Sequence, residues 1–456
     1  MEEVTVLDAD PIVHCTTIGC DIHSSNVVCC CLQRQIDGSW KQTSKTFPTD
    51  YVHLLEFAQW CIDLRPSVIL MESTASYWMS AFDILQLRGL PITIVNPAHV
   101  KAMAGRKTDH CDAHWLATIA LNNSFQASYV PPMEYRHLRA VERNVTKQMQ
   151  VVQACKNRET KLFVTAGYRL NIFSDEFGKI SMKVKDAILA GKSATEILAL
   201  VKQEKGSNRL KATDDELLVA FNGNMTSHLR FAIQSNRRMY KFAVQEVATG
   251  KEYVMQEIQR LDHTSYQFLQ TIPGIDRWAA AIIITEIGGC ESFLHAFKKS
   301  DGFAAWLGLC PGNNSSNSKR TGKKGRHGDS YLRNVLCEVA QSAVRTKGTT
   351  FQSKFKSLVI RLGFKRSIVA IAHKIAKMVH YVLFHQRSYR DPKINYQDLA
   401  CQRNRARWIK QLLACQDLEI SVKNRNTGEV IDTQTFRNTQ HVERRIALQE
   451  EVARQA

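Results

Sequence analysis

Four acidic residues in the first quarter of the chain have types and spacings that suit Mg²⁺-dependent phosphodiester chemistry. Asp21 and Glu72 each end an apolar run, and Asp109 and Asp112 stand three apart at the start of a helical stretch, so the last two share one helix face. Hard oxygen ligands suit Mg²⁺, and two such ions about 4 Å apart can activate the attacking oxygen and stabilise the leaving one. The alternative interpretation is that these acids are helix caps and solvated loop residues. We favour a metal site, because all four fall at positions that one fold brings together.

The pattern of strands and helices around these acids predicts an α/β RNase H-like (RuvC-like) domain over residues 14–130. Apolar runs predict three initial strands, with the hairpin turn Asp37-Gly38-Ser39-Trp40 between the second and the third. The predicted strands are 16–21, 26–33, 41–47, 67–72 and 91–95, and the predicted helices are 51–63, 77–88 and the stretch after Asp112. The resulting order, βββαβαβα, is that of an RNase H-like fold, in which carboxylates on the first strand, the fourth strand and a late helix can converge.

The net charge of +18 is concentrated in one segment of the chain. Residues 297–390 hold 19 Lys and Arg against three Asp and Glu, whereas residues 1–125 hold eight against thirteen. A basic module joined to an acidic one suits a polyanion-binding surface combined with a metal-binding site. The alternative is a basic but merely solvated surface.

Cysteine usage and hydropathy predict a soluble, intracellular protein. The thirteen Cys residues follow no disulfide or zinc spacing, which fits reduced core residues in a cytosol. We expect no apolar stretch of the roughly 20 residues that a membrane span needs, and the N-terminus is acidic rather than signal-like. The expected location is therefore the cytoplasm, with no membrane partner.

Beyond Pro131-Pro132 the pattern changes to long helices, predicted over about 135–165 and 228–261. Seven positions of the second helix repeat at alternating spacings of four and three, which predicts a coiled-coil region over 131–265. The helix could pair within the chain or form a dimer zipper; we favour an antiparallel hairpin with oligomer contacts, because Gly250 interrupts a short seam. Residues 168–226 are predicted to be a small helical insertion. The seam consists of Tyr240, Val244, Val247, Lys251, Val254, Ile258 and Leu261.

Residues 266–390 are predicted to form a mainly α-helical C-terminal domain. It begins with Ile272-Pro273-Gly274-Ile275 before an apolar helix, a turn that resembles a helix-hairpin-helix element whose amides can face a phosphate. An ordinary helix start is the alternative. Further on, a loop of small, polar and cationic residues contains Ser315 and Ser316. A Ser hydroxyl there could attack a phosphate while Lys and Arg offset its charge, although residue types alone also fit a flexible surface loop.

Taken in order, these motifs resemble those of the insertion-sequence 110/1111 family of transposases. The members are site-specific DNA recombinases that join an N-terminal RuvC-like DEDD domain to a C-terminal domain with a nucleophilic Ser. The resemblance covers roughly residues 16–390. It rests on the four acids with their flanking residues, Asn96-Pro97, the Pro-Gly turn, Gly308-Leu309-Cys310-Pro311, the Ser315-Ser316 loop, Gly328-Asp329 to Leu332-Arg333, and Lys374 within Ile371-Ala372-His373-Lys374.

The resemblance implies that the four acids are catalytic metal ligands for Mg²⁺ (or Mn²⁺) and that Ser316 is the nucleophile. The implied activity is that of a DNA transposase, which cuts and rejoins the DNA of a mobile insertion sequence through a covalent phosphoserine. The family's Ser is usually followed by Gly, whereas Asn317 follows here. Asn tolerates positive φ better than most residues, and Ser315 stays an alternative nucleophile. Because the acids and Ser316 lie in different domains, they could meet between subunits of a dimer or tetramer.

The resemblance also implies nucleic-acid partners: DNA of the element ends and target, and a structured guide RNA encoded beside the gene. Base pairing would then supply sequence specificity while the protein reads backbone and shape. No RNA-recognition motif is visible in the sequence, and the expected location is the nucleoid of a prokaryotic cell. The tail 391–456, basic around Trp408, could touch nucleic acid or form a solvated amphipathic helix. Candidate phosphate contacts are Lys319, Arg320, Lys323, Lys324, Arg326, Arg333, Lys365, Arg366 and Lys374.

Two other functions fit the same residues. One is a RuvC-like, metal-dependent hydrolytic nuclease or junction resolvase, in which water replaces Ser316 as the nucleophile. The other is a non-catalytic nucleic-acid-binding protein descended from such an enzyme, in which substitution of Asp21 or Asp109 would not affect function.

Overall fold

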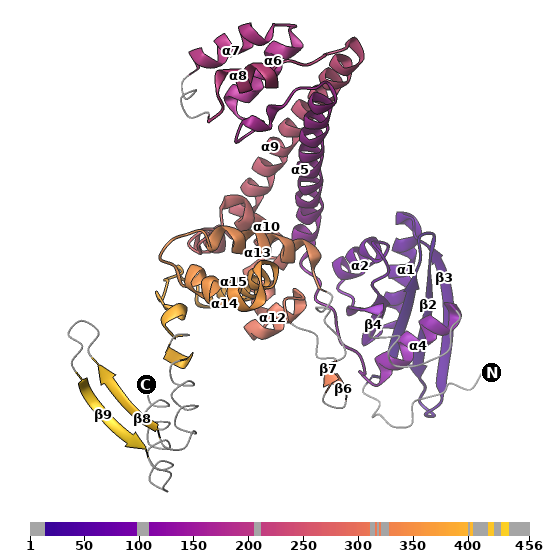
Figure 1. The fold of residues 1–456 in the computed structure, drawn as a ribbon. Coiled ribbons are helices and arrows are strands. Elements are labelled where there is room, and N and C mark those ends of the chain that lie inside the picture. The colour runs from indigo at the N-terminus through magenta and orange to yellow at the C-terminus, as the bar shows by residue number, and fades with distance from the viewer. Residues whose placement is uncertain are drawn as a thin grey trace. The chain divides into compact units, whose positions relative to one another are not determined.

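The computed structural model describes residues 14–97, 109–204, 211–310, 315–316, 319–320, 328–399, 402–404, 418–423 and 430–436 (Figure 1). The chain divides into two compact units, unit 1 (Met1–His137) and unit 2 (Leu138–Ala456).

Unit 1 has the predicted order of strands and helices. Its elements are β1 (Thr16–Ile22), β2 (Asn26–Arg34), β3 (Trp40–Pro48), α1 (Tyr51–Leu64), β4 (Val68–Glu72), α2 (Trp78–Leu87), β5 (Ile92–Val95) and α4 (Asp109–Leu121). The predicted hairpin turn has Gly38 at a φ of 84°, and the Asp37 carboxylate accepts a hydrogen bond of 2.9 Å from the amide of Ser39. Gly adopts this left-handed conformation without steric cost, so the turn residues explain where β2 and β3 reverse.

The five strands form one mixed sheet in the order β3-β2-β1-β4-β5. β1, β2 and β3 pair antiparallel, whereas β4 pairs in parallel with both β1 and β5. The carboxyl ends of β1 and β4 therefore lie side by side, near the middle of the sheet. This is the strand topology of an RNase H-like fold.

Helices cover both faces of this sheet, as Figure 1 shows. On one face α1 and α2 pack over a core that includes Cys20, Met71 and Phe57. On the other face α4 packs over residues of the alternate positions, with Leu116 beside Leu70 of β4 and Ala117 beside Cys30 of β2. Alternation along the strands thus assigns every second residue of β1 and β4 to the α4 face.

Unit 2 is mainly helical. Its long helices are α5 (Met133–Thr165, which begins in unit 1), α9 (Ser227–Leu269) and α15 (Phe364–His385). The shorter elements are η1 (Leu170–Ile172), α6 (Lys179–Leu189), α7 (Ala194–Gln203), α8 (Asp214–Ala220), α10 (Arg277–Ile287), α11 (Cys290–Ala296), α12 (Ser300–Trp306), β6 (Ser315–Ser316), β7 (Lys319–Arg320), α13 (Ser330–Ala343), α14 (Thr350–Leu362), β8 (Leu418–Lys423) and β9 (Val430–Phe436).

α5 and α9 run antiparallel along unit 2. The Asn236 side chain of α9 donates to the carbonyl of Cys155 in α5 at 2.8 Å, and Gly250 lies against Val145 further along the same pair. The backbone of α9 departs from helical angles at Asp262, one residue beyond the predicted helix end. The antiparallel hairpin was therefore predicted correctly, whereas coiled-coil packing and the oligomer contacts stay predictions.

The heptad seam is only partly covered within the chain. Val254 and Ile258 are fully buried, but Val244 has 40% of its surface exposed. Lys251, the charged position in the seam, places its ammonium group 5.1 Å from the ring of Trp278 in α10. The C-terminal half of α9 thus packs on the C-terminal helices.

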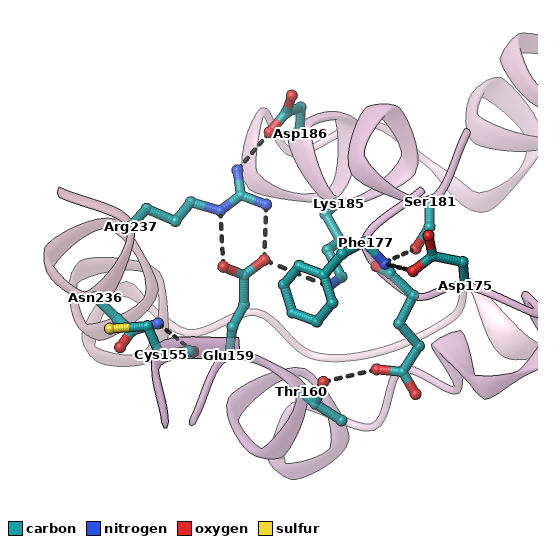
Figure 2. Close-up of polar contacts among 11 residues, drawn as sticks. Cys155, Glu159, Thr160, Asp175, Phe177, Ser181, Lys185, Asp186, Asn236 and Arg237 are labelled. Atoms are coloured by element: carbon teal, nitrogen blue, oxygen red, sulfur yellow. Dashed lines mark hydrogen bonds and ion pairs between the residues drawn. The ribbon is translucent and has the colours of Figure 1, made fainter. Parts of the chain in front are cut away.

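Within 168–204 and 211–226, the helices form a small cluster packed on the ends of α5 and α9. Its core includes Phe163 of α5, Val184 of α6 and Ile233 of α9. Figure 2 shows the buried ion pairs beside this core, in which Glu159 accepts two hydrogen bonds from Arg237 and lies 3.5 Å from the Lys185 ammonium group. Since Glu159 and Lys185 are almost fully buried, these charges fix α6 between α5 and α9.

The C-terminal helices pack around α15. By length and mean hydropathy of 1.3, α15 could span a membrane, so the expectation that no apolar stretch reaches that length was wrong. However, 56% of its apolar window is buried within the fold. Its buried side chains, among them Ile371, Ile375 and Val379, repeat with the period of a helix face turned to a core, which explains the high hydropathy.

The segment after residue 390 packs on α14 and α15. Asp391 accepts hydrogen bonds from the backbone and side chain of Thr350, and the amide of Tyr396 donates to Ser353 at 2.7 Å. β8 and β9 then pair antiparallel. Neither strand was predicted from the sequence, although the alternating pattern of Leu418–Lys423 is a signal for one.

Candidate active site

The contacts between β1 and α4 set the position of Asp21. The Thr17 hydroxyl donates to the carbonyl of Ala117 at 2.9 Å, and a Cβ on Gly19 would lie 2.1 Å from the carbonyl oxygen of Ala113. Two residues further along β1, the contact on α4 is therefore one turn closer to the N-terminus of that helix. The next residue on this face is Asp21, at the level of the first turn of α4, which contains Asp109 and Asp112. Gly19 is required here because any side chain would push the helix away from the strand.

Glu72 reaches the same face from the neighbouring strand. In the parallel β1–β4 ladder, Cys20 is paired with Met71, so Asp21 and Glu72 are the next residues along each strand. Cys20 and Met71 belong to the core under α1 and α2, and the residues after them therefore take the opposite face. The backbone register thus brings together two of the predicted metal ligands.

Asp21 is 7% exposed, and its Oδ2 lies 3.2 Å from Nε2 of His23. Asp112 is half-buried on α4, while the side chain of Asp109 lies outside the described residues. Within the described part of the chain, no group of three or more His, Cys, Asp or Glu side chains is close enough to hold a metal ion. The donor types nevertheless fit a divalent ion, because carboxylates from adjacent strands offer the hard oxygen ligands that Mg²⁺ prefers.

The two candidate nucleophiles lie on a minimal hairpin. β6 and β7 pair antiparallel, with Ser315 opposite Arg320 and Ser316 opposite Lys319. Asn317, the departure from the family's Gly, lies outside the described residues.

The base of the loop that carries this hairpin is tightly closed. Gly308, at a φ of 67°, ends the turn after α12, and Gly328 precedes α13. A Cβ on Gly328 would lie 2.4 Å from the amide nitrogen of Gly308. The amide of Asp329 also donates to the carbonyl of Trp306. The two ends of the loop therefore meet, and the hairpin extends from one fixed point.

A buried ion network connects the base of this loop to α5. The Asp329 side chain caps α13 by accepting from the amide of Leu332 at 3.0 Å, and it lies 3.8 Å from the Arg143 guanidinium group. Arg143 donates two hydrogen bonds, of 2.9 and 3.0 Å, to the carboxylate of Glu286 in α10. It also stacks 4.3 Å from the ring of Tyr331. Burial raises the pKa of Glu286, against the opposing effect of its arginine partners.

Glu142 adds a second buried carboxyl group to this network. It is 1% exposed, and burial is the main cause that raises its pKa from 4.5 to about 7. Glu286 and Asp329 raise the pKa further, whereas the Thr146 hydrogen bond and Arg143 lower it. Neither carboxyl group was predicted from the sequence, because Glu286 pairs with Arg139 and Arg143 across more than 140 residues of chain, and the burial of Glu142 depends on the same packing.

We expect Glu142→Gln to stabilise unit 2 in a pH-dependent way. The unfolded carboxyl group ionises near pH 4.5, but the folded one stays neutral until about pH 7. The wild type therefore loses stability as the pH rises between these values. The free energy of unfolding of the variant, measured by urea denaturation, should exceed that of the wild type by about 2 kcal/mol more at pH 8 than at pH 5. An equal difference at both pH values would contradict the buried, neutral carboxyl group.

The predicted phosphate contacts have different surroundings. Lys365 and Arg366 are exposed at the start of α15, and Arg333 is half-buried on α13. Lys374 donates to the Tyr396 hydroxyl at 2.6 Å and is half-buried. The side chains of the other five, Lys319, Arg320, Lys323, Lys324 and Arg326, lie outside the described residues.

The Pro-Gly turn is occupied by contacts within the protein. Gly274 has a φ of 91°, and a Cβ there would lie 2.5 Å from the carbonyl oxygen of Val339 in α13. The Asp276 side chain caps α10 by accepting from the amide of Ala279 at 2.7 Å. Helix packing and capping explain these residue types, so a phosphate contact at this turn stays a prediction.

The strand order of unit 1, with carboxylates near the ends of the adjacent strands β1 and β4 under a covering helix, is that of an RNase H-like fold. One family model, described as Transposase, matches residues 18–166, and another, described as Transposase IS116/IS110/IS902 family, matches residues 266–356. The chain belongs to the IS116/IS110/IS902 family of transposases. It is a DNA transposase, as its sequence resemblance predicted.

The alignments with individual relatives cover most of each relative's length. A family 20 transposase of Pseudomonas aeruginosa is 26% identical over 333 residues, which is 72% of this chain and 87% of the relative. The transposase for insertion sequence element IS1111A of Coxiella burnetii is 23% identical over 361 residues, 76% of this chain and 85% of the relative. Among solved structures, Thermus thermophilus RuvC matches 25% of this chain and 99% of its own, with 13% identity and a TM-score of 0.20.

Proposed function

We propose that this transposase cuts and rejoins the ends of a mobile DNA element through a covalent phosphoserine at Ser316, assisted by Mg²⁺ (or Mn²⁺) bound at Asp21, Glu72, Asp109 and Asp112. The observation that carries the proposal is the register of β1 and β4, which end in adjacent carboxylates on the face covered by α4. The hairpin with Ser316 opposite Lys319 supports the nucleophile. Family membership supports the combination of the two halves.

The proposed reaction is a transesterification at phosphorus. The Ser316 hydroxyl oxygen attacks the phosphorus atom and loses its proton to solvent. The bond from phosphorus to the leaving strand breaks, and that strand's oxygen keeps the electron pair. Because the new ester conserves the phosphodiester energy, a hydroxyl group of another strand can reverse the attack without ATP. Lys319 and Arg320, opposite the two serines, offset the charge of the phosphate.

The acidic residues of unit 1 would hold the metal ion: Asp21 and Glu72 from two strands, and Asp109 and Asp112 from α4. When bound, the metal would supply Lewis-acid polarisation of the scissile phosphate and favour the ionised nucleophile. The acids and Ser316 belong to different units, so we propose that the working enzyme is a dimer or tetramer whose subunits complete each other's sites. A structured RNA encoded with the element would guide it to target DNA.

Arg143 is expected to affect catalysis through the position of the serine loop. Replacement by Leu removes the two hydrogen bonds to Glu286 and the contact with Asp329 at the loop base. We expect Arg143→Leu to slow covalent adduct formation by at least about tenfold, while the Kd for DNA changes by less than about twofold. Single-turnover adduct formation and DNA titrations measure the two effects.

The matched control is Arg260→Leu, which removes an exposed ion pair with Glu257 on α9. Exposed pairs of this kind contribute little, so the control should form the adduct at the wild-type rate. Equal loss in both variants would contradict a specific role of Arg143 at the loop.

The experiment that tests the proposed function follows adduct formation on DNA that carries the element's ends. With Mg²⁺, and with RNA transcribed from the element's flanks, a denaturing gel should show DNA attached to the protein. Removal of divalent ions with EDTA should lower the rate by about 10³-fold, and added Mg²⁺ should restore it. Adduct formation at the same rate in EDTA would contradict the metal site.

A hydrolytic nuclease or junction resolvase is the second candidate function. The register of Asp21 and Glu72 serves that reaction equally well, because a metal-activated water could replace the Ser hydroxyl. Such an enzyme would cut DNA without any covalent protein–DNA product. The gel therefore separates the two functions.

A further inference from the structure

The turn between α14 and α15 carries an apolar side chain that the fold leaves almost bare. Ile360, in the last turn of α14, has 90% of its surface exposed, the largest value among the large apolar side chains that the structure describes in unit 2. Gly363 ends α14 at a φ of 73°, and Phe364, which begins α15, is 55% exposed. A single exposed Ile is common on protein surfaces, so its surroundings decide what it can do.

Four exposed cations accompany this Ile, two on α14 and two in the first turn of α15. Lys356 lies one helical turn before Ile360 on the same face of α14, and Arg361 follows it directly. Lys365 and Arg366 are the two on α15. Within the part of the chain that the structure describes, none of the four forms an ion pair. We call residues 356–366 the α14–α15 tip.

The sequence around the tip contains no acidic residue. Between Glu338 and Asp391 the chain has eleven Lys and Arg and no Asp or Glu. Asp391 itself accepts a hydrogen bond from the amide of Thr350, at the opposite end of α14 from the tip. Only positive charge therefore accompanies the exposed Ile in this stretch, which favours a polyanionic partner.

Contacts within unit 2 fix the backbone of the tip. The Ser367 hydroxyl donates to the carbonyl of Gly363 at 2.8 Å, and the Gly363 amide donates to the carbonyl of Val359 at 2.9 Å. The Phe364 ring meets the Phe355 ring edge-on, with the two centroids 5.7 Å apart. Because the backbone is already ordered, a side chain of the tip can enter a ligand with little further loss of conformational freedom.

We propose that Ile360 inserts between two stacked base pairs of duplex DNA, from the minor groove, while the four cations bind the phosphates on either side. Apolar wedges of this kind, with Lys and Arg beside them, unstack a base step and kink the duplex. The inference rests on the proposed function, because strands that exchange must first come apart near the cut.

A DNA duplex fits the tip better than an anionic membrane does. A helix that lies on a membrane needs a continuous apolar face, whereas the exposed face of α14 carries Lys356 one turn from Ile360. A wedge needs only a short apolar side chain between cations. Duplex RNA is recognised mainly by its shape and its 2′-hydroxyl groups, so the expected partner is DNA.

The fluorescence of 2-aminopurine tests the insertion, since it rises when the base leaves the stack. We would titrate the full-length protein into a duplex of about 20 base pairs whose TA steps, the easiest to kink, carry 2-aminopurine in place of adenine. Divalent ions are left out so that the DNA stays intact. The wild type should raise the fluorescence at least about twofold, whereas an RNA duplex of the same sequence should not respond.

Ile360→Ala should lose most of this signal, because the remaining methyl group is too short to separate two base pairs. Ile360→Lys separates insertion from charge. It should also lose the signal, yet keep the Kd for the duplex within about threefold of the wild-type value, since it adds a cation. Both substitutions change an exposed side chain, so folding should be unaffected. Val219→Ala, at a side chain that is 65% exposed on α8, is the matched control and should keep the full signal.

A fluorescence rise that persists in both Ile360 variants would overturn the proposal, as would no rise in the wild type at saturating protein. An equal rise with the RNA duplex would overturn the assignment to DNA. If Ile360→Ala lost binding to phosphatidylglycerol vesicles but kept the DNA signal, the tip would be a membrane contact instead.

The adduct assay separates failure of this inference from failure of the proposed function. An adduct without unstacking that depends on Ile360 removes only the wedge. Unstacking without an adduct removes the phosphoserine mechanism and leaves the wedge.

Discussion

Ser316→Ala is expected to abolish the covalent protein–DNA adduct. Alanine has no oxygen to attack the phosphorus, and loss of a catalytic nucleophile typically costs at least about 10⁴-fold in rate. DNA binding should be retained, since the exposed cations of α15, such as Lys365 and Arg366, are unchanged. The assay compares adduct yield on a denaturing gel with DNA affinity measured on the same preparation.

Ser315→Ala is the matched control, because the two serines are adjacent on β6. We expect it to form the adduct within about threefold of the wild-type rate. Loss of the adduct in Ser315→Ala but not in Ser316→Ala would move the nucleophile by one residue. Unchanged DNA cleavage in both variants would favour the hydrolytic nuclease.

Asp21→Asn is expected to have an effect of similar size through the other half of the site. The amide removes the negative charge and offers at most one metal-binding oxygen, at the strand end where β1 and β4 bring two carboxylates together. We expect adduct formation to fall by at least about 10³-fold at saturating DNA. Folding should be unaffected because Asn has nearly the same volume.

Asp63→Asn is the control for Asp21→Asn. Asp63 is exposed near the end of α1 and accepts a hydrogen bond from Gln59, so its replacement should leave adduct formation unchanged. Partial rescue of Asp21→Asn by Mn²⁺, which binds nitrogen and oxygen ligands more readily than Mg²⁺, would further support a direct metal contact. An Asp21→Asn enzyme with full activity would favour a non-catalytic role for unit 1.

The fold of unit 1 was predictable because local signals decide it. Apolar runs define β1, β2 and β4, and the Asp37–Trp40 turn fixes the pairing of β2 with β3. The positions of the acids then follow from the sheet topology, since parallel strands end at the same edge. Asp21 and Glu72 could therefore be placed together from the sequence. The tight packing of Gly19 on Ala113, which sets the height of α4, could not be predicted from sequence alone.

The ion network of unit 2 was beyond prediction because its partners are far apart along the chain. Arg143 lies in a long helix with many charged residues, and nothing local distinguishes it from the solvated ones. Glu286 does carry a signal, as the one acid within the apolar helix α10. A buried acid requires a cationic partner, but the sequence does not say which Arg provides it. The burial of Glu142 depends on the same long-range packing.

The heptad seam of α9 shows another limit of prediction from sequence. Its heptad spacing predicted a helix with an apolar face, and the structure confirms the helix and its antiparallel partner. Spacing does not state which partner covers each position. Val254 and Ile258 are buried within the chain, whereas Val244 is exposed.

In the proposed reaction, DNA becomes covalently joined to one serine of the β6–β7 hairpin. Mass spectrometry of the adduct, after digestion with nuclease and protease, tests this directly. We expect a nucleotide phosphate attached to Ser316 in the peptide that contains residues 315–320. A phosphate on another residue, or DNA cut at the element's ends with no modified peptide at all, would contradict it.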